Sequence, residues 1–246
     1  MARFFIPPHL WKPDRMVLDG GEAHHAIDVL RLKAGDRVTV FNGQGGEATA
    51  EIVSANKQEL QLKAVHTAKT PALTCEITLG QAVPKGKNME LIIEKATELG
   101  ASRIVPLLSE RTVVSMDSDD ALKKKQKWQR VAIEASKQCG QNWLPSVLTP
   151  QTPKEFFNGG HGFDLMLIAS LQPDAQPLKK ILADFGAQRP RKVLILVGPE
   201  GDFTPAEISL AKGSGCRPIT LGPIILRTET AALYCLSVLS HELLGQ

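Results

Sequence analysis

The chain has 246 residues, of which 43% are hydrophobic and 22% charged, and its formal net charge is +3. This composition excludes an intrinsically disordered chain, which needs fewer apolar residues and a larger net charge. The length allows two domains with separate cores. No stretch of the sequence reaches the roughly 18 apolar residues that a membrane-spanning helix requires.

The start of the chain and its cysteines indicate an intracellular protein. The first residues, MARFFIPPHLWKPDR, contain prolines and no long apolar run, so they make a poor signal peptide. The four cysteines form no C-x-x-C pair, which argues against a disulfide framework and a zinc site. We therefore expect a soluble, cytoplasmic protein with reduced and mostly buried thiols at Cys75, Cys139, Cys216 and Cys235.

Residues 1–70 predict a small β-rich domain. Short β-prone runs cover Arg37–Phe41, Ala50–Val53 and Leu60–Val65, and glycine-containing turns separate them. A helical stretch at Glu22–Leu30 interrupts these runs, because its apolar residues follow helical spacing. Short strands with one helix are typical of a small barrel.

After a polar, proline-containing segment at His66–Ala72, which we take as a linker, residues 74–246 predict an α/β domain. Strands alternate with helical patterns, and this alternation is typical of a mainly parallel sheet covered on both faces. Ligands of such sheets bind beyond the carboxyl ends of the strands. The expected strands are Cys75–Val83, Ile104–Leu108, Phe163–Ala169, Val193–Val197 and Pro218–Leu221.

The expected helices of the second domain have recognisable ends. Apolar faces recur over Met89–Leu99 and Trp128–Ala135, and Gly100 follows the first of these as a C-terminal cap. The run Thr204–Glu207 reads TPAE, a capping box with proline at the first helical position. A last helix with one apolar face is expected over Thr228–Leu244.

Two segments at strand ends have the composition of a ligand site. Leu194–Phe203 reads LILVGPEGDF, and its glycines let a ligand approach the backbone, although a plain turn has a similar composition. Ile219–Ala231 reads ITLGPIILRTETA, and the apolar triplet in this loop is unusual unless it lines a pocket or is partly buried. Helix capping explains Thr228 and Glu229, but it does not explain Arg227.

Other kinds of site lack their motifs. No G-x-G-x-x-G follows a strand and no G-x-x-x-x-G-K-[ST] occurs, which argues against an ordinary nucleotide-dependent α/β enzyme. The adjacent His24 and His25 diverge on a helix, so no metal site is expected. Neither Ser109 nor Ser136 lies in a nucleophile elbow.

The blocks GPEGDF and LGPIILRTETA resemble the characteristic loops of the ribosomal small-subunit RNA methyltransferase E family, which are SPOUT-class uridine N3-methyltransferases. The blocks HHAIDVLRLKAGDRVTVFNGQG, EKATELGASRIVPLLSERTVV and QCGQNWLP match as well, in the family's order and over nearly the whole chain. The resemblance implies a PUA-like, RNA-binding β-barrel at residues 1–70. It implies a SPOUT α/β methyltransferase domain with a trefoil knot at residues 74–246.

The resemblance also implies an activity and partners. The expected reaction is methylation of N3 of one uridine in the 16S ribosomal RNA of the small subunit. The donor would be S-adenosylmethionine, which leaves S-adenosylhomocysteine as product. The family forms homodimers, and neither a membrane nor a metal is expected.

Site residues follow from the matching blocks and from the chemistry of the reaction. Uridine N3 must lose a proton before it attacks, so we expect Arg227 to stabilise the uridine anion or its phosphate. Glu200 and Glu229 are expected proton acceptors or sulfonium partners, with a helix-capping role as the alternative for Glu229. RNA contact is expected at Arg3, Arg31, Lys33, Arg37, Lys85 and Lys87. The expected cofactor-binding residues are Leu171, Leu196, Val197, Gly198, Glu200, Gly201, Leu221, Gly222, Ile225, Leu226, Thr228, Thr230 and Ala231.

The sequence departs from the family pattern at three positions. Ile224 and Gln141 stand where the family usually has arginine, and Asp202 stands where it usually has glycine. The two missing charges favour weaker RNA contact near the site, while the donor-loop glycines are unaffected. Two alternatives therefore stay open: a non-catalytic RNA-binding protein that keeps the fold, and a methyltransferase for another RNA position or atom.

Overall fold

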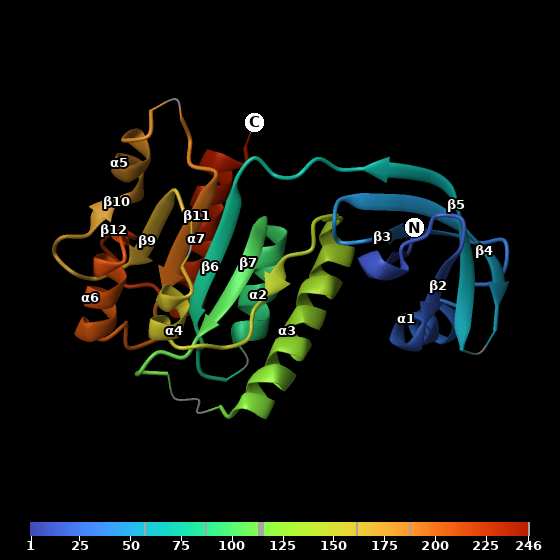
Figure 1. Ribbon diagram of the computed structural model, residues 1–246, viewed down its shortest axis with the longest axis horizontal. Coiled ribbons are helices and arrows are strands. Elements are labelled where there is room, and N and C mark those ends of the chain that lie inside the picture. Colours follow the sequence, from blue (N-terminus) through green and yellow to red (C-terminus); the bar gives the residue numbers. More distant parts are fainter. Residues whose placement is uncertain (57, 87, 113–115, 161, 187, 246) are drawn as a thin grey trace. The chain divides into compact units, whose positions relative to one another are not determined.

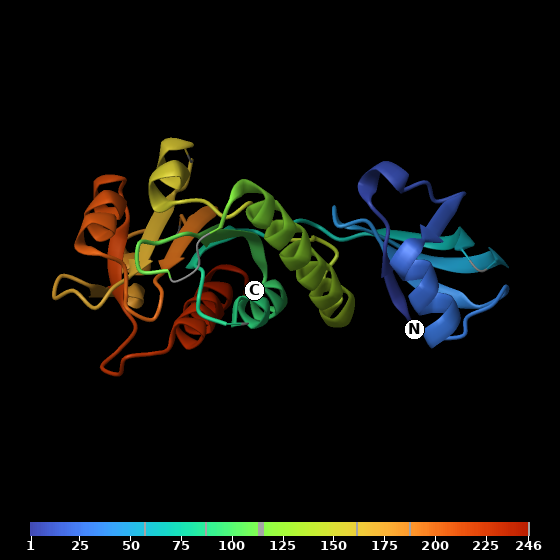
Figure 2. The ribbon, with the colours of Figure 1, turned by 90° about the horizontal axis from the view of Figure 1, so that it is seen from below.

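The computed structural model describes every residue except 57, 87, 113–115, 161, 187 and 246. The chain forms two compact units. One consists of Met1–Ala72 together with Ile133–Leu144, and the other consists of Leu73–Ala132 together with Pro145–Gln246. Figures 1 and 2 show the elements of each unit from two directions.

The first unit is built on a five-stranded sheet with the order β1-β3-β4-β5-β2. Only β1 and β3 run parallel; the other neighbours are antiparallel. The strands' alternating buried side chains and the helical segment form one core, which includes Phe4, Val38 and Leu62. The bounds are β1 Arg3–Phe5, β2 Met16–Asp19, β3 Arg37–Phe41, β4 Gly46–Ala55 and β5 Glu59–Lys69, with the 3-10 turn η1 Pro8–Leu10, the helix α1 Gly20–His24 and the π-helical turn η2 His25–Val29.

The prediction of a linker over His66–Ala72 is wrong for its first half. The strand β5 continues to Lys69 because the long hairpin partner β4 pairs with it as far as Gly46. The predicted strand at Arg37–Phe41 is confirmed, and so is the helical stretch predicted over Glu22–Leu30, which begins two residues earlier, at Gly20, and ends at Val29. The turn between β3 and β4 contains Gly43 and Gly45, both with positive φ, as hairpin turns favour.

The second unit is built on a seven-stranded sheet with the order β10-β12-β9-β11-β6-β7-β8. Every neighbouring pair in it is parallel, which confirms the expected α/β architecture. The bounds are β6 Glu76–Ala82, β7 Ala101–Leu107, β8 Ser146–Val147, β9 Leu165–Ala169, β10 Gln176–Pro177, β11 Lys192–Val197 and β12 Arg217–Thr220.

Helices cover both faces of this sheet. In Figure 2, α2 and α7 lie together on one side, while α4 and α6 lie on the other. The central strand β11 is buried from Val193 to Val197, as a strand packed on both faces must be. Leu194 and Leu196 pack into the cluster that contains α4 and α6 side chains. The bounds are α2 Asn88–Glu98, α3 Ser118–Cys139, α4 Pro153–Asn158, α5 Leu178–Ala183, α6 Pro205–Gly213 and α7 Thr228–Leu243.

Sequence signals at the helix ends are reproduced in the second unit. Thr204 and Glu207 form the predicted capping box at α6, with Pro205 as the first helical residue. Gly100 follows α2 with a φ of +83°, which suits a glycine C-terminal cap. In the part of the chain that the structure describes, no helix has the length and apolar character needed to cross a membrane.

Candidate functional site

A cavity of about 580 Å³, including the space at its open mouth, lies at the carboxyl edge of the parallel sheet. Three neighbouring strands, β12, β9 and β11, end there, and the loops that follow them form the walls together with the start of α7. The lining residues of the cavity are Ala169, Ser170, Leu171, Val197, Gly198, Pro199, Glu200, Asp202, Leu221, Gly222, Ile224, Ile225, Leu226, Thr228 and Ala231.

The cavity has a buried floor and an exposed apolar rim. Val197 and Thr228 on the floor are 2% and 4% exposed, whereas Ile224 and Ile225 on the rim are 74% and 75% exposed. All three residues of the apolar triplet line the cavity, which confirms one of the two expected explanations for it; the other, partial burial, is wrong for Ile224 and Ile225. Only Leu226 is half-buried, because it adjoins the anchored start of α7.

Close packing fixes the loop between β11 and α6. A Cβ atom on Gly198 would lie 3.1 Å from Asp202 Oδ1 and 3.2 Å from Phe203 N, so this position suits glycine. Asp202 has a φ of +61°, a conformation that favours glycine, and its carboxylate accepts a hydrogen bond from Phe203 N at 2.7 Å. The turn thus holds a carboxylate at the cavity wall where the family usually has glycine.

The hydroxyl of Thr228 joins this loop to α7. It donates to the carbonyl of Gly198 at 2.6 Å and accepts from Nε2 of Gln81 at 2.9 Å. The prediction that Thr228 caps its helix is wrong, because Arg227 occupies the N-cap position and no side chain caps the helix there. The sequence signal for Gln81 was absent, since Gln81 lies 147 residues from Thr228.

A second network connects the loop after β7 to the start of α6. The buried carboxylate of Glu207 accepts from Ser109 Oγ at 3.0 Å and from Glu110 N at 2.9 Å. The guanidinium of Arg111 donates to the carbonyl of Gly201 in the cavity loop. The sequence gives no signal for the contacts of Ser109 and Arg111, because neither contact follows a local pattern.

Most of the predicted cofactor-binding residues line the cavity. Three of them do not: Leu196 packs in the core, Gly201 is exposed and contacts Arg111, and Thr230 is exposed on α7. Those that line it are Leu171, Val197, Gly198, Glu200, Leu221, Gly222, Ile225, Leu226, Thr228 and Ala231.

The three predicted catalytic residues lie at or beside the cavity. Glu200 is exposed and lines it, and its Oε1 accepts a hydrogen bond from the backbone N of Lys85 at 3.1 Å. Arg227 is exposed at the N-cap of α7, and Glu229 is half-buried in the first turn. Neither of these two lines the cavity, although both flank the lining residue Thr228.

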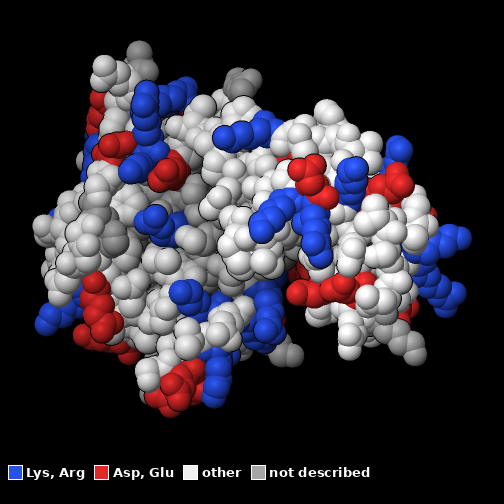
Figure 3. Space-filling view, turned by 45° about the vertical axis from the view of Figure 1, so that its right-hand side comes forward, with Lys and Arg blue, Asp and Glu red and all other residues white. Residues whose placement is uncertain are grey.

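The predicted RNA-binding residues are found in different surroundings. Arg31, Lys33 and Arg37 are exposed in the first unit, where Arg37 lies 3.9 Å from a carboxylate oxygen of Glu51. Lys85 is exposed beside the cavity, and Lys87 lies outside the described residues. Figure 3 shows lysine and arginine side chains interspersed with acidic ones on the face in view, without one dominant basic patch.

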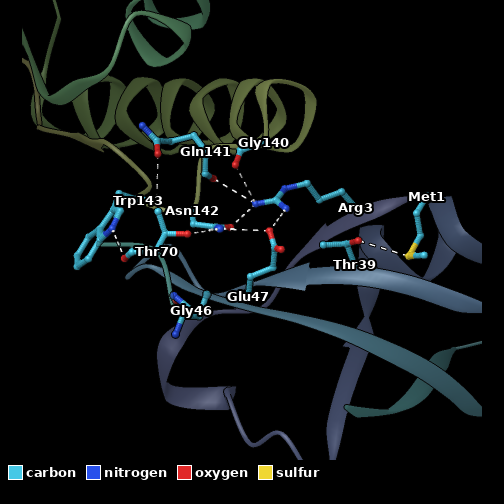
Figure 4. A network of polar contacts seen from close by, with 11 residues as sticks. Met1, Arg3, Thr39, Gly46, Glu47, Thr70, Gly140, Gln141, Asn142 and Trp143 are labelled. Carbon is cyan, nitrogen blue, oxygen red and sulfur yellow. Dashed lines mark hydrogen bonds and ion pairs between the residues drawn. The ribbon is translucent and has the colours of Figure 1, made fainter. Parts of the chain in front are cut away.

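The side chain of Arg3 is committed to a network inside the first unit (Figure 4). It forms an ion pair of 2.6 Å with Glu47, donates to Asn142 Oδ1, and stacks 4.5 Å above the ring centroid of Phe41. Asn142 Nδ2 in turn donates to Glu47 at 3.2 Å and to Thr70 Oγ1 at 2.8 Å. With 12% of its side chain exposed, Arg3 serves this network and presents little surface to a partner, and its predicted contact with RNA stays a prediction.

The same network accounts for the electrostatics of Glu47. Burial by itself would raise the pKa of this carboxyl, but hydrogen bonds from Arg3 and Asn142 and the charge of Arg3 outweigh it and lower the pKa. Gln141, which stands where the family usually has arginine, contributes a backbone carbonyl to Arg3 at 3.5 Å. Among the described residues, no cluster of three or more histidine, cysteine or acidic side chains is arranged to hold a metal.

Comparisons with known proteins agree with this architecture. Residues 71–240 match the family model of the RNA methyltransferase domain, and residues 18–65 match that of the RNA methyltransferase PUA domain. A ribosomal RNA small subunit methyltransferase E from Bacillus subtilis is 31% identical, with 98% of this chain and 97% of that protein covered. Its counterpart from Synechocystis is 33% identical, with 96% and 76% covered.

A solved structure extends the likeness to three dimensions. The ribosomal RNA small subunit methyltransferase E of Neisseria gonorrhoeae, crystallised with S-adenosyl methionine bound, has a TM-score of 0.85 and 30% identity. The match covers 98% of each chain. On the two family models and these full-length relatives, the chain belongs to the ribosomal RNA small subunit methyltransferase E family.

Proposed function

We propose that this protein transfers a methyl group from S-adenosylmethionine to N3 of a uridine in 16S ribosomal RNA. The observation that carries the proposal is the cavity formed by three loops at the carboxyl edge of the sheet, two of which contain glycine. Open parallel sheets bind their ligands at this edge. The Neisseria gonorrhoeae relative, which has the same architecture, was crystallised with this donor.

The lining of the cavity fits the chemistry of the donor. When bound, S-adenosylmethionine supplies a methyl group on a positively charged sulfonium. Two carboxylates, Glu200 and Asp202, line the cavity and suit a cation. The apolar side chains of Leu171, Ile225 and Leu226 suit the faces of adenine. We propose the lining residues predicted from the sequence as the donor-binding set.

Arg227 is proposed to act on the base. Uridine N3 is a poor nucleophile until its proton leaves, so a group that stabilises the resulting anion accelerates the reaction. The exposed Arg227 at the start of α7 presents planar donors that suit an oxyanion of the base or a phosphate. Glu200 is the favoured proton acceptor because it lines the cavity, while Glu229 lies in the first turn, where it complements the positive end of α7.

The first unit is proposed to hold the RNA. The match of residues 18–65 to a PUA domain of RNA methyltransferases supports this role. Arg31, Lys33 and Arg37 are the proposed phosphate ligands there, and Lys85 is a proposed ligand beside the donor site, while Lys87, which lies outside the described residues, stays a prediction. Arg3 is left out of this set because its guanidinium is paired internally. The target base must be unpaired, since N3 is hidden in a duplex.

We also propose a cytoplasmic homodimer with a trefoil knot in its second unit. The exposed Leu171, Ile224 and Ile225 around the cavity mouth support an assembly that covers them, because such apolar groups are costly to leave in water. The three loops that meet at one cavity are compatible with a threaded chain. A sedimentation equilibrium experiment that found only monomers at micromolar concentration would refute the dimer.

The activity is tested with labelled donor and small ribosomal subunits that lack the modification, followed by nucleoside analysis. We expect label in 3-methyluridine. Arg227→Ala should lower the turnover number by about 10²–10³-fold. Calorimetry should find its affinity for S-adenosylmethionine unchanged within about twofold, since the proposed role concerns the base. Arg227→Lys is the matched variant, which keeps the charge but loses the planar fork and should recover only part of the rate.

Each negative outcome has a distinct meaning. Undiminished turnover of Arg227→Ala would remove Arg227 from the mechanism. Label in another nucleoside would favour a methyltransferase for a different RNA position. Donor binding without any transfer would favour the non-catalytic RNA-binding protein, and absence of donor binding would refute the proposal.

A further inference from the structure

A fully buried amide lies beneath the cavity without lining it. Gln81 is the penultimate residue of β6, where it pairs in register with Val197, the last residue of β11. Its side chain has no exposed surface. A polar side chain at the end of a buried parallel strand is costly unless its hydrogen bonds are used.

The hydrogen bonds of this amide have only one consistent direction. The hydroxyl of Thr228 has a single proton, and it donates that proton to the carbonyl of Gly198 at 2.6 Å. Thr228 can therefore only accept from Gln81, whose Nε2 lies 2.9 Å away. The same Nε2 donates to the carbonyl of Ala82 at 2.9 Å. If the amide were flipped, its oxygen would face the oxygens of Ala82 and Thr228, which both act as acceptors. The series of hydrogen bonds therefore runs from Gln81 through Thr228 to Gly198.

This series of hydrogen bonds connects two residues of the cavity floor. Gly198 and Thr228 both line the cavity, and they belong to different elements, the loop after β11 and the helix α7. Pro199 follows Gly198 and has no N–H, so the peptide group between these two residues can be held only through the carbonyl of Gly198. Thr228 as a whole residue is only 4% exposed, so water cannot reach its hydroxyl to replace these hydrogen bonds.

One atom of Gln81 remains without a partner. Its Oε1 is buried and accepts no hydrogen bond within the described part of the protein. A leucine or methionine would remove this unsatisfied atom, so stability alone does not favour an amide here. The amide does supply the one donor that orients the hydroxyl of Thr228 toward Gly198.

We infer that Gln81 is a positioning residue of the donor site, which holds the Gly198 carbonyl and the start of α7 in the geometry that binds the donor. The inference rests on the proposed function, because it names a role in the same site. Gln81 does not line the cavity, so its effect must pass through Thr228. Loss of either hydrogen bond lets the loop and the helix move apart and weakens donor binding.

The experiment compares Gln81→Met, Thr228→Val and the double variant. Methionine has a similar length and shape to glutamine but has no amide, and valine has the shape of threonine without its hydroxyl. We expect each single change to raise the dissociation constant for S-adenosylmethionine, measured by calorimetry, about tenfold. The donor KM should rise in parallel, while kcat at saturating donor changes less than threefold. Thr228→Ser keeps the hydroxyl and should restore most of the affinity.

A matched control separates positioning from a general loss of stability. Thr97 in α2 is also a buried threonine whose hydroxyl donates to a backbone carbonyl, that of Ile93, at 2.8 Å. Thr97→Val also removes a buried hydroxyl, but away from the cavity, and the thermal midpoints of both variants are measured beside that of the unchanged protein. Thr97→Val should leave the affinity for the donor unchanged.

The decisive readout is additivity. Because Gln81 acts through Thr228, the double variant should bind the donor as weakly as Thr228→Val alone, within twofold. Multiplied effects in the double variant, or Gln81→Met with native affinity, would overturn the inference. If Gln81→Met does not fold, equal donor affinity of Thr228→Val and Thr228→Ser would overturn it. Failure of the unchanged protein to bind the donor would instead refute the proposed function.

Discussion

The four thiols of the chain lie in different surroundings, and the difference predicts which of them reacts. Burial raises the pKa of Cys216 and of Cys235 to about 12 each. Burial, with the nearby charges of Asp164 and Glu76, raises the pKa of Cys75 to about 11. Cys139 is exposed at the end of α3. The expectation of mostly buried thiols is confirmed, with Cys139 as the exception.

We therefore expect an aromatic disulfide reagent at pH 8 to modify one thiol of the native protein and all four in denaturant. The thiolate is the reacting form, and burial disfavours it at the other three positions. Absorbance of the released thiol gives the count. Cys139→Ser, the control, should show no rapid phase, and two rapidly reacting thiols in the native protein would contradict the burial of Cys75.

At the residue scale, the sequence predicted local roles and missed distant ones. The capping box of Thr204 and Glu207 follows from a four-residue pattern, and it is confirmed. The pattern around Thr228 also suggested a cap, but Arg227 holds the N-cap position, and the hydroxyl of Thr228 instead donates to Gly198 and accepts from Gln81, 147 residues away. No local signal marks such a contact, because it is created by the parallel pairing of β6 with β11.

At the scale of elements, the predicted strands that carry the site are confirmed to within a residue at the ends that reach it. The prediction Val193–Val197 corresponds to β11 Lys192–Val197, and Pro218–Leu221 corresponds to β12 Arg217–Thr220. Apolar runs of this length between turn signals are informative. The strands β8 and β10 were missed because each has only two residues, too few to show a period.

The network that ties β1 to β4 and to the segment after α3 predicts a pH dependence. The pKa of Glu47 is lowered in the folded protein, so its contribution to stability is present above the unfolded pKa near 4.5 and is lost as pH falls through the folded value. Glu47→Gln removes this contribution at neutral pH. It should lower the free energy of unfolding by about 1–2 kcal/mol at pH 7, since a part-buried charge pair is broken.

Urea unfolding at pH 7 and at pH values below 4.5 measures how the free energy of unfolding of each protein depends on pH. The difference between the native protein and Glu47→Gln should shrink as the solution is acidified through that window. Glu51→Gln is the matched control, because Glu51 lies 3.9 Å from Arg37 with both side chains exposed and should contribute little. A difference that stays constant with pH would show that Glu47 does not act through its charge.

At the scale of the whole molecule, the charge distribution limits how RNA can be held. The formal net charge is +3, and basic side chains are interspersed with acidic ones in Figure 3. On the face in view, RNA binding would therefore depend on individual well-placed cations instead of a broad basic patch. The sequence indicated two missing positive charges, one at Ile224 at the cavity mouth and one at Gln141 in the first unit, only by comparison with a family pattern. Periodicity and composition alone carry no information on such positions.

A substitution at Ile224 tests whether the missing charge limits RNA binding. It lies at the cavity mouth, 74% exposed, where an arginine side chain has room and contact with solvent. Ile224→Arg should strengthen binding of single-stranded RNA severalfold at low salt. It should also steepen the dependence of log affinity on log salt by about 0.7, the value for one added phosphate contact.

Affinity for a 16S ribosomal RNA fragment, measured by fluorescence anisotropy between 50 and 200 mM salt, gives both quantities. Ile224→Gln is the matched control, since it makes the rim polar without adding charge and should leave the slope unchanged. If the two variants change affinity and slope equally, the gain comes from removing an exposed apolar group. A steeper slope for the arginine variant alone means that RNA phosphate passes within reach of position 224, which puts the RNA backbone at the mouth of the cavity proposed to hold the donor.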